Sequence, residues 1–147
     1  MDVKNGYAAK LYYKVGGLSG GGTWTELTLV RDATLNMPKA EGDVTTRGSG
    51  GYKNTKGGLR DVSIEFELLA DTDDAGFDAI QTAYLDDTTI ALAVMDGAIA
   101  AAEGLQADCE ILDFSRSEPL EGPQTVTVVA KPTHSDTAPS YVDNAAT

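Results

Sequence analysis

The chain has very little of the chemistry that enzymes and metal sites commonly use. Among its 147 residues there is one cysteine, Cys109, and one histidine, His134. A lone cysteine cannot form a disulfide within the chain, and structural zinc needs several Cys or His ligands. A serine or cysteine nucleophile would have to rely on His134, which follows the last predicted strand. We therefore predict no enzyme, no metal and no cofactor.

Positive charge is also scarce. The sequence has 11 Lys and Arg residues against 23 Asp and Glu residues, a formal net charge of −12. Binding to nucleic acids depends on Lys and Arg that neutralise phosphates, and anionic membranes attract the same residues. The composition disfavours both kinds of partner. Two interpretations stay open, since an acidic surface can simply maintain solubility or can prevent sticking to a polyanion.

Long apolar runs are missing too. The longest, Ile90–Met95, is far shorter than the ~20 residues that span a bilayer. The first residues, Met1–Gly6, lack the apolar segment of a secretory signal, so we expect a soluble protein made in the cytoplasm. Hydrophobic residues still make up 41% of the chain, enough for the core of one domain.

Alternation of apolar and polar residues predicts a mainly β protein. In Arg60–Leu69 the two kinds alternate from Asp61 to Leu68, as they do in a half-buried strand. A turn or a bulge is expected at Arg31-Asp32, and a bulge in residues 105–114, where the apolar parity changes before Leu112. Similar signals predict the remaining strands at residues 8–15, 24–37, 88–95, 105–114 and 124–131.

One amphipathic helix is predicted over about residues 73–85, because Phe77, Ile80 and Tyr84 share a face. The acidic run before it, residues 71–74, suits the unpaired N–H groups and the dipole of a helix N-terminus. A calcium loop would need an oxygen ligand and a glutamate where the chain has Ala75 and Thr82. The fold class is therefore mainly β (α+β), an antiparallel β-sandwich or barrel with one flanking helix.

The glycine-rich residues 38–58 are expected to form a long loop between strands. A loop of this length is unusual in a compact domain unless it has a function or a partner. Residues 48–53 resemble a phosphate-binding loop only loosely, because no Gly-Lys-Ser/Thr leads into a helix. We expect the loop to become ordered on a partner. Residues 1–134 are predicted to be a single domain with an N-terminal arm, and residues 135–147 a C-terminal tail.

The order of these segments resembles the major tail tube proteins of tailed bacteriophages. The resemblance covers residues 7–134 and is carried by residues 24–27, 30–35, 41–52, 58–66, 94–97 and 126–133. It implies a β-sandwich with one helix, joined edge to edge into hexameric rings that stack into a tube. Related tubes occur in contractile injection and type VI secretion systems.

The resemblance also implies a location and partners. The protein would belong to the virion tail and assemble in the host cytoplasm. Its partners would be other copies of itself, a tape measure protein, a tail terminator and a distal tail protein. DNA would pass through the lumen without specific binding, and the chain would not bind a membrane.

Candidate assembly residues follow from this resemblance and from strand parity. The predicted contacts between subunits or rings lie in the loop: Asp43, Arg47, Gly48, Gly50, Gly51, Tyr52, Lys53 and Lys56. The acidic residues predicted to face the bore and repel DNA are Glu65, Glu67, Asp108 and Glu110. The alternatives are another virion β-protein, such as a tail terminator or a head decoration protein, or a soluble ligand-binding β-domain with a deep apolar pocket.

Overall fold

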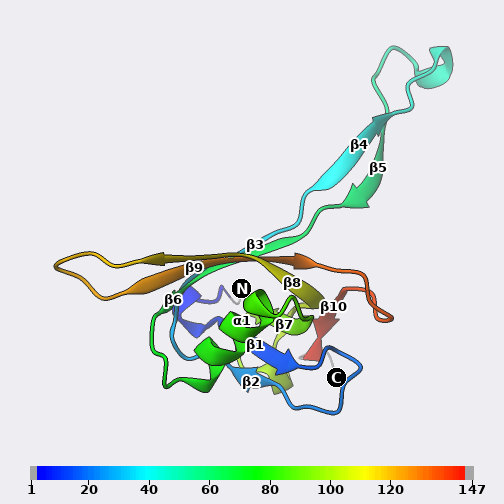
Figure 1. The fold of residues 1–147 in the computed structure, drawn as a ribbon. Helices are drawn as coiled ribbons and strands as arrows, with labels where there is room; N and C mark the ends of the chain where they lie inside the picture. The colour runs from blue at the N-terminus through cyan, green and yellow to red at the C-terminus, as the bar shows by residue number, and fades with distance from the viewer. Residues whose placement is uncertain (1–2, 145–147) are drawn as a thin grey trace.

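The computed structural model describes residues 3–144, which form a β-rich body with two projections (Figure 1). The body contains one antiparallel sheet of eight strands and the helix α1 (Ala75–Leu85). Three single-turn 3-10 helices lie at Gly6–Ala8, Arg47–Ser49 and Ile99–Ala101. The strands of the body are β1 (Lys10–Val15), β2 (Thr25–Glu26), β3 (Val30–Asn36), β6 (Ser63–Leu69), β7 (Ile90–Met95), β8 (Glu103–Ser117), β9 (Thr125–Pro132) and β10 (Ser140–Asp143).

The long strand β8 belongs to two layers of the sheet. Its first half pairs with β7 on one side and β10 on the other, and its second half pairs with β9. Near the start of the second half, the register with β9 shifts between Ile111 and Asp113, which is the predicted bulge and bends the strand. One layer is therefore β2-β1-β7-β8-β10, and the other is β8-β9-β6-β3. This arrangement confirms the predicted antiparallel sandwich.

The core lies between the two layers, and α1 covers it. Ile64, Leu92 and Val128 come from different strands and are 0% exposed in a shared hydrophobic cluster. The ring centroid of Phe114 on β8 lies 5.7 Å from that of Phe77 and 5.9 Å from that of Tyr84, both on α1. Burial of such side chains supplies most of the stability of a small domain.

The predicted helix is confirmed, and the interpretation of its acidic start as a cap holds. The Asp74 carboxylate accepts the Phe77 N–H at 2.9 Å, which satisfies one of the orphan donors of the first turn. Asp71 accepts the Asp73 N–H at 3.0 Å in the preceding turn. The acidic residues are therefore used for local backbone structure.

The sequence predicted a long loop over residues 38–58, but the structure has a strand at each end of this segment. These residues belong to a two-stranded hairpin, β4 (Lys39–Asp43) and β5 (Thr55–Arg60), that projects away from the body (Figure 1). We call residues 39–60 the arm. Neither face of the arm is buried, so its strands lack the apolar alternation from which strands are predicted.

The C-terminal segment also differs from its prediction as a tail. Ser140–Asp143 form β10, which pairs with Glu103–Gln106 of β8 and extends the first layer. Four residues give too short a pattern for prediction, and the strand is defined by its backbone pairing. Residues 145–147 lie outside the described residues.

Gly104 is a position where packing demands glycine. It lies in β8 opposite Met95, and a Cβ atom there would overlap the carbonyl of Val94 on β7. The overlap involves backbone on a central strand, so rotamer changes cannot relieve it.

We expect Gly104→Ala to lower the free energy of unfolding by about 3 kcal/mol or more. Chemical denaturation followed by circular dichroism would measure this. Gly42→Ala is a matched control on the arm, because its Cβ would lie 3.6 Å from the nearest atom, the carbonyl oxygen of Lys56. Equal stability of the two variants would contradict the prediction.

Candidate assembly surfaces

The second layer of the sandwich has two unpaired edges. We call β3, β6, β9 and residues 110–117 of β8 the four-stranded layer. Within residues 3–144, β3 pairs only with β6, and residues 110–117 pair only with β9. Exposed strand edges carry unused N–H and C=O groups and readily accept a strand from another chain. The layer can thus be extended at both sides.

The outer face of the four-stranded layer is polar and acidic. Register places Glu65 opposite Val129 and Glu110 opposite Lys131, so both carboxylates lie on the side away from the core. Glu67 shares this face, where Arg31 approaches it at 3.5 Å. Three of the four residues predicted to line a bore are therefore brought together on one surface.

Asp113 belongs to the same face and was not among the predicted residues. It lies opposite Val129 because the bulge between Ile111 and Asp113 reverses the parity of β8. The parity change in the sequence was the available signal. Applying it to the candidate residues would have placed Asp113 on the same face as Glu110.

Asp108 is buried, so the prediction that it lines a bore is wrong. Its side chain is 4% exposed, and its Oδ1 accepts the Leu18 N–H at 2.6 Å. The glycine-rich loop after β1 folds over this part of the sheet, where Gly17 adopts a φ of 88° and approaches the carboxylate closely. Strand parity identified the correct face but could not show that a loop covers it.

We expect Asp108→Ala to lower the free energy of unfolding by about 1–3 kcal/mol, because the Leu18 N–H loses its acceptor. Glu110→Ala, two residues along the same strand, should change it by less than about 0.5 kcal/mol. Equilibrium denaturation of both variants would measure the difference. A neutral effect of Asp108→Ala would show that the carboxylate does not hold the loop.

The far end of the arm is ordered by local hydrogen bonds. The Asn54 N–H donates to Thr45 Oγ1 at 2.8 Å, and the Asn54 amide donates to Ser49 Oγ at 2.9 Å. Gly50 and Gly51 take φ values of 70° and 87°, which glycine adopts at little cost. Hydrogen bonds from the Thr45 hydroxyl and N–H hold the pKa of Asp43 below its ordinary value. The far end of the arm therefore has a defined shape.

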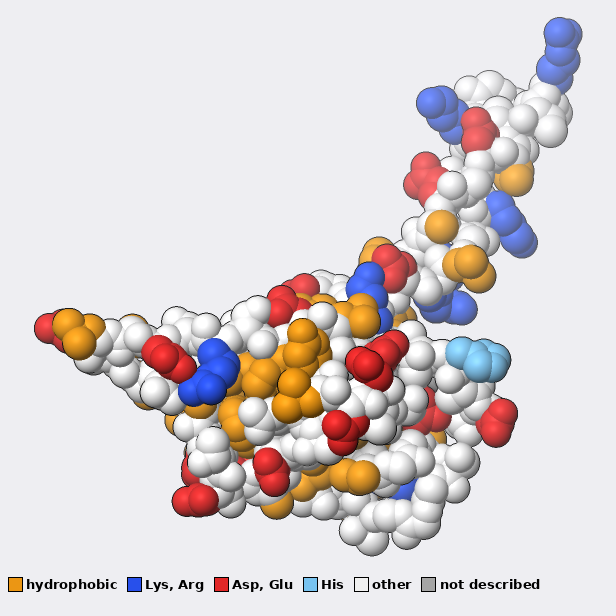
Figure 2. Space-filling view, in the orientation of Figure 1, with side chains coloured by type: hydrophobic (Ala, Val, Ile, Leu, Met, Phe, Trp, Pro, Cys, Tyr) orange, Lys and Arg blue, Asp and Glu red, His pale blue; other side chains and the backbone are white. Residues whose placement is uncertain are grey.

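The composition of the arm is opposite to that of the body. Residues 39–60 contain five basic and two acidic residues, a net charge of +3, whereas the rest of the chain carries six basic and 21 acidic residues, a net charge of −15. Figure 2 shows the blue side chains gathered along the arm and the red ones spread over the body. All eight loop residues predicted to make contacts lie on the arm and are exposed.

The arm has almost no internal burial. Every residue from 39 to 60 is exposed except Ser49, which is half-buried, and Leu59 is 87% exposed. A two-stranded hairpin by itself is marginally stable in water. Exposed apolar side chains on such an element are typical of a surface that packs against another molecule.

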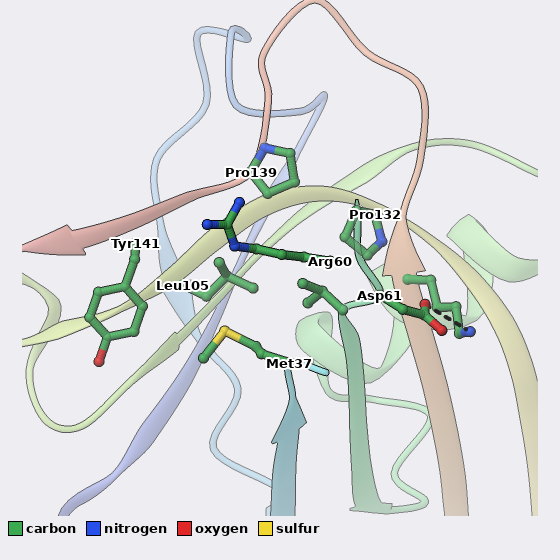
Figure 3. Close-up of a pocket in the computed structure, with 9 residues that line it drawn as sticks. Met37, Arg60, Asp61, Leu105, Pro132, Pro139 and Tyr141 are labelled. Carbon is green, nitrogen blue, oxygen red and sulfur yellow. Dashed lines mark hydrogen bonds and ion pairs between the residues drawn. The ribbon is translucent and has the colours of Figure 1, made fainter. Parts of the chain in front are cut away.

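A cavity of about 660 Å³ lies beside the base of the arm (Figure 3). We call it the base pocket. Its lining combines apolar side chains with three charged ones, Arg60, Asp61 and Lys131. Lys131 and Asp61 approach each other at 3.5 Å. This lining differs from the deep apolar pocket that a soluble ligand-binding β-domain would need. The apolar residues include Met37, Leu105, Pro132 and Pro139.

Cys109, the single thiol, faces the core. It is 0% exposed, and burial together with the neighbouring Asp108 raises its pKa to about 12. It therefore behaves as a small apolar side chain and not as a nucleophile.

Among the helices of residues 3–144, none has both the length and the apolarity required to cross a bilayer.

The thiol of Cys109 should resist modification by a thiol reagent at pH 8 in the folded protein and react fully in denaturant. Because folding raises its pKa, the contribution of this group to stability is complete below pH 9 and is lost as the pH rises toward 12. Thiol titration with and without denaturant tests this. Rapid reaction of the folded protein would contradict burial of the thiol.

Unpaired strand edges and an exposed arm on a β-sandwich are typical of structural proteins that assemble with other chains. The sequence of residues 8–131 matches the family model described as phage tail tube protein. The chain belongs to this family, which consists of structural tail proteins and not enzymes. No curated protein sequence matches it.

Solved structures have the same fold at low sequence identity. A chain from the tail of an empty gene transfer agent particle, refined with C6 symmetry, aligns with a TM-score of 0.76 and 16% identity over 95% of this chain and 99% of that one. A chain of the SPP1 tail tube aligns with a TM-score of 0.71 and 14% identity over 88% and 75%. A chain from the anti-feeding prophage baseplate aligns with a TM-score of 0.62 and 2% identity over 98% of each.

Proposed function

We propose that this chain forms rings by joining β3 of one copy to residues 110–117 of β8 in the next. The rings stack into a tail tube whose bore is lined by the outer face of the four-stranded layer. The single observation that carries the proposal is the pair of unpaired edges on this layer. Family membership supports the role in a tube, and the C6 symmetry of a structurally similar tail supports six copies in each ring.

Strand direction makes this joint possible. The strands of the layer alternate in direction, so β3 and β8 run in opposite senses. Rotation about a tube axis preserves direction, and it therefore brings β3 of one copy antiparallel to β8 of its neighbour. The lengths also match, because β3 has seven residues and the free part of β8 has eight, residues 110–117. Closing the ring removes every free edge of the layer.

The charge of the outer face suits a passage for DNA. Glu65, Glu67, Glu110 and Asp113 outnumber Arg31 and Lys131 on or beside this face. Phosphates approaching such a wall are repelled at short range, where screening by salt is weakest. DNA would pass without binding. The other partners expected for such a tube are a tape measure protein, a tail terminator and a distal tail protein.

The arm joins neighbouring copies in this arrangement. Its net charge of +3 is opposite to that of the body, and its exposed Val44, Tyr52 and Leu59 supply apolar area. Packing on another copy would bury this apolar area and stabilise a hairpin that has no core of its own. We propose that the eight predicted residues on the arm make these contacts between copies.

Electron microscopy of the purified protein tests the proposal directly. The wild-type chain should form rings and tubes, and a reconstruction should place Glu65 and Glu110 at the bore. A closed ring that never stacks would favour a tail terminator. A monomer, or a ring with these carboxylates on its outer wall, would contradict the proposed function.

Shortening the arm should abolish tube growth without unfolding the body. Asp43 pairs with Thr55, so residues 44–54 can be replaced by Asn-Gly, which closes a two-residue hairpin turn. We expect unchanged circular dichroism and thermal unfolding but no tubes by negative-stain microscopy. The control is Gly42→Ala, which keeps the length of the arm and changes none of the eight predicted contact residues. Tubes of wild-type length from the shortened chain would exclude the arm as a joint.

A further inference from the structure

The turn between β8 and β9 carries a leucine that the fold does not use. We call residues 118–124 the tip. Leu120 is 101% exposed, and Glu118 and Glu121 flank it. Figure 1 shows that the tip projects far from the body, and Figure 2 shows apolar and acidic side chains at its extremity. A fully exposed leucine at the end of a projecting turn contributes nothing to folding, so it is available to contact another molecule.

The base pocket lies at the opposite end of the same four-stranded layer. The tip connects the end of β8 to the start of β9, whereas the pocket is lined by Val62, just before β6, and by Lys131 and Pro132 at the end of β9. The arm leaves the body at the pocket end, and the tip leaves it at the other end (Figure 1). The two features are therefore separated along the strands and not across them.

The lining of the base pocket complements the apolar and acidic side chains of the tip. Leu105, Pro132 and Pro139 offer apolar surface, and Arg60 and Lys131 offer positive charge. In Figure 3 the Arg60 guanidinium points toward the Pro139 side of the pocket. Among the ion pairs of residues 3–144, Lys131 pairs with Asp61, while Arg60 has no carboxylate within 4.0 Å. The pocket can accept an apolar side chain and still has a cation to pair.

We propose that the tip of one copy inserts Leu120 into the base pocket of a copy in the next ring, with Glu121 facing Arg60. This inference rests on the proposed function, because it requires rings that stack. Joints within a ring use the edges of the layer, and joints between rings must use its ends, where the tip and the pocket lie. Different surfaces of identical copies meet in such a contact, which repeats indefinitely along a stack.

Disulfide cross-linking tests the contact by position. Leu120→Cys and Met37→Cys place thiols on the tip and in the pocket, while the native Cys109 is buried and does not take part. A mixed assembly of the two single variants should give a two-chain disulfide after oxidation. Mixing Met37→Cys with Val15→Cys, whose side chain is also exposed, is the control and should give none.

The doubly substituted chain, Leu120→Cys with Met37→Cys, shows the direction of the contact. If each tip reaches the next ring, oxidised tubes should give a ladder on a non-reducing gel that continues beyond the number of subunits in one ring. A ladder that stops at that number would place the contact within a ring and overturn the proposal. Absence of cross-links in tubes that form normally would overturn it as well.

Charge exchange tests the chemistry. Arg60→Glu and Glu121→Arg should each raise the protein concentration needed for tube growth about tenfold or more, because every subunit of a ring interface loses the contact. The double variant exchanges the two charges and should return the concentration to near the wild-type value. A double variant no better than the single ones would contradict the pairing.

Leu120→Asp should block stacking, and Val15→Asp is its matched control at another exposed apolar position. Both residues are exposed, so circular dichroism should show that both variants fold. Wild-type tubes together with normal stacking of Leu120→Asp would overturn this inference and leave the proposed function intact. A wild-type protein that forms neither rings nor tubes would overturn both.

Discussion

The pairing of β8 is the constraint on which the rest of the structure depends. From Gly104 to Gln106 this strand has partners on both sides, β7 and β10, whereas from Glu110 to Ser117 it has only β9. Pairing with β7 ends at Cys109, where pairing with β9 begins, and the bulge between Ile111 and Asp113 follows directly. Because β7 ends there while β8 continues into the second layer, one edge of that layer is left without a partner. The two layers and the free edge thus all depend on how β8 is paired along its length.

Charge is divided between the parts of the molecule in a way that matters only between copies. A body of net charge −15 repels other copies of itself at short range. The arm, at +3, is the part that another body attracts. Attraction of this kind orients partners and speeds their association more than it strengthens the final contact. The apolar side chains of the arm supply the area that a stable contact needs.

Much of the fold was predictable from the sequence because a buried face imposes a regular pattern. Ile64, Phe66 and Leu68 alternate with polar residues, and Phe77 and Ile80 share a helical face, so β6 and α1 were predicted with nearly their observed bounds. The arm was predicted as a loop because neither of its faces is buried. β10 was missed because four residues held by backbone pairing leave no pattern in the side chains.

For the candidate site, the sequence alone determined which side chains point away from the core, because parity along a strand fixes the face of each residue. It also determined the scarcity of cysteine, histidine and basic residues, and with it the absence of a recognisable catalytic set. Only the tertiary structure decided which outward carboxylates reach solvent. It buried Asp108 under the loop after β1 and placed Asp113 across β9 from Glu65, because exposure and strand order depend on segments distant in sequence.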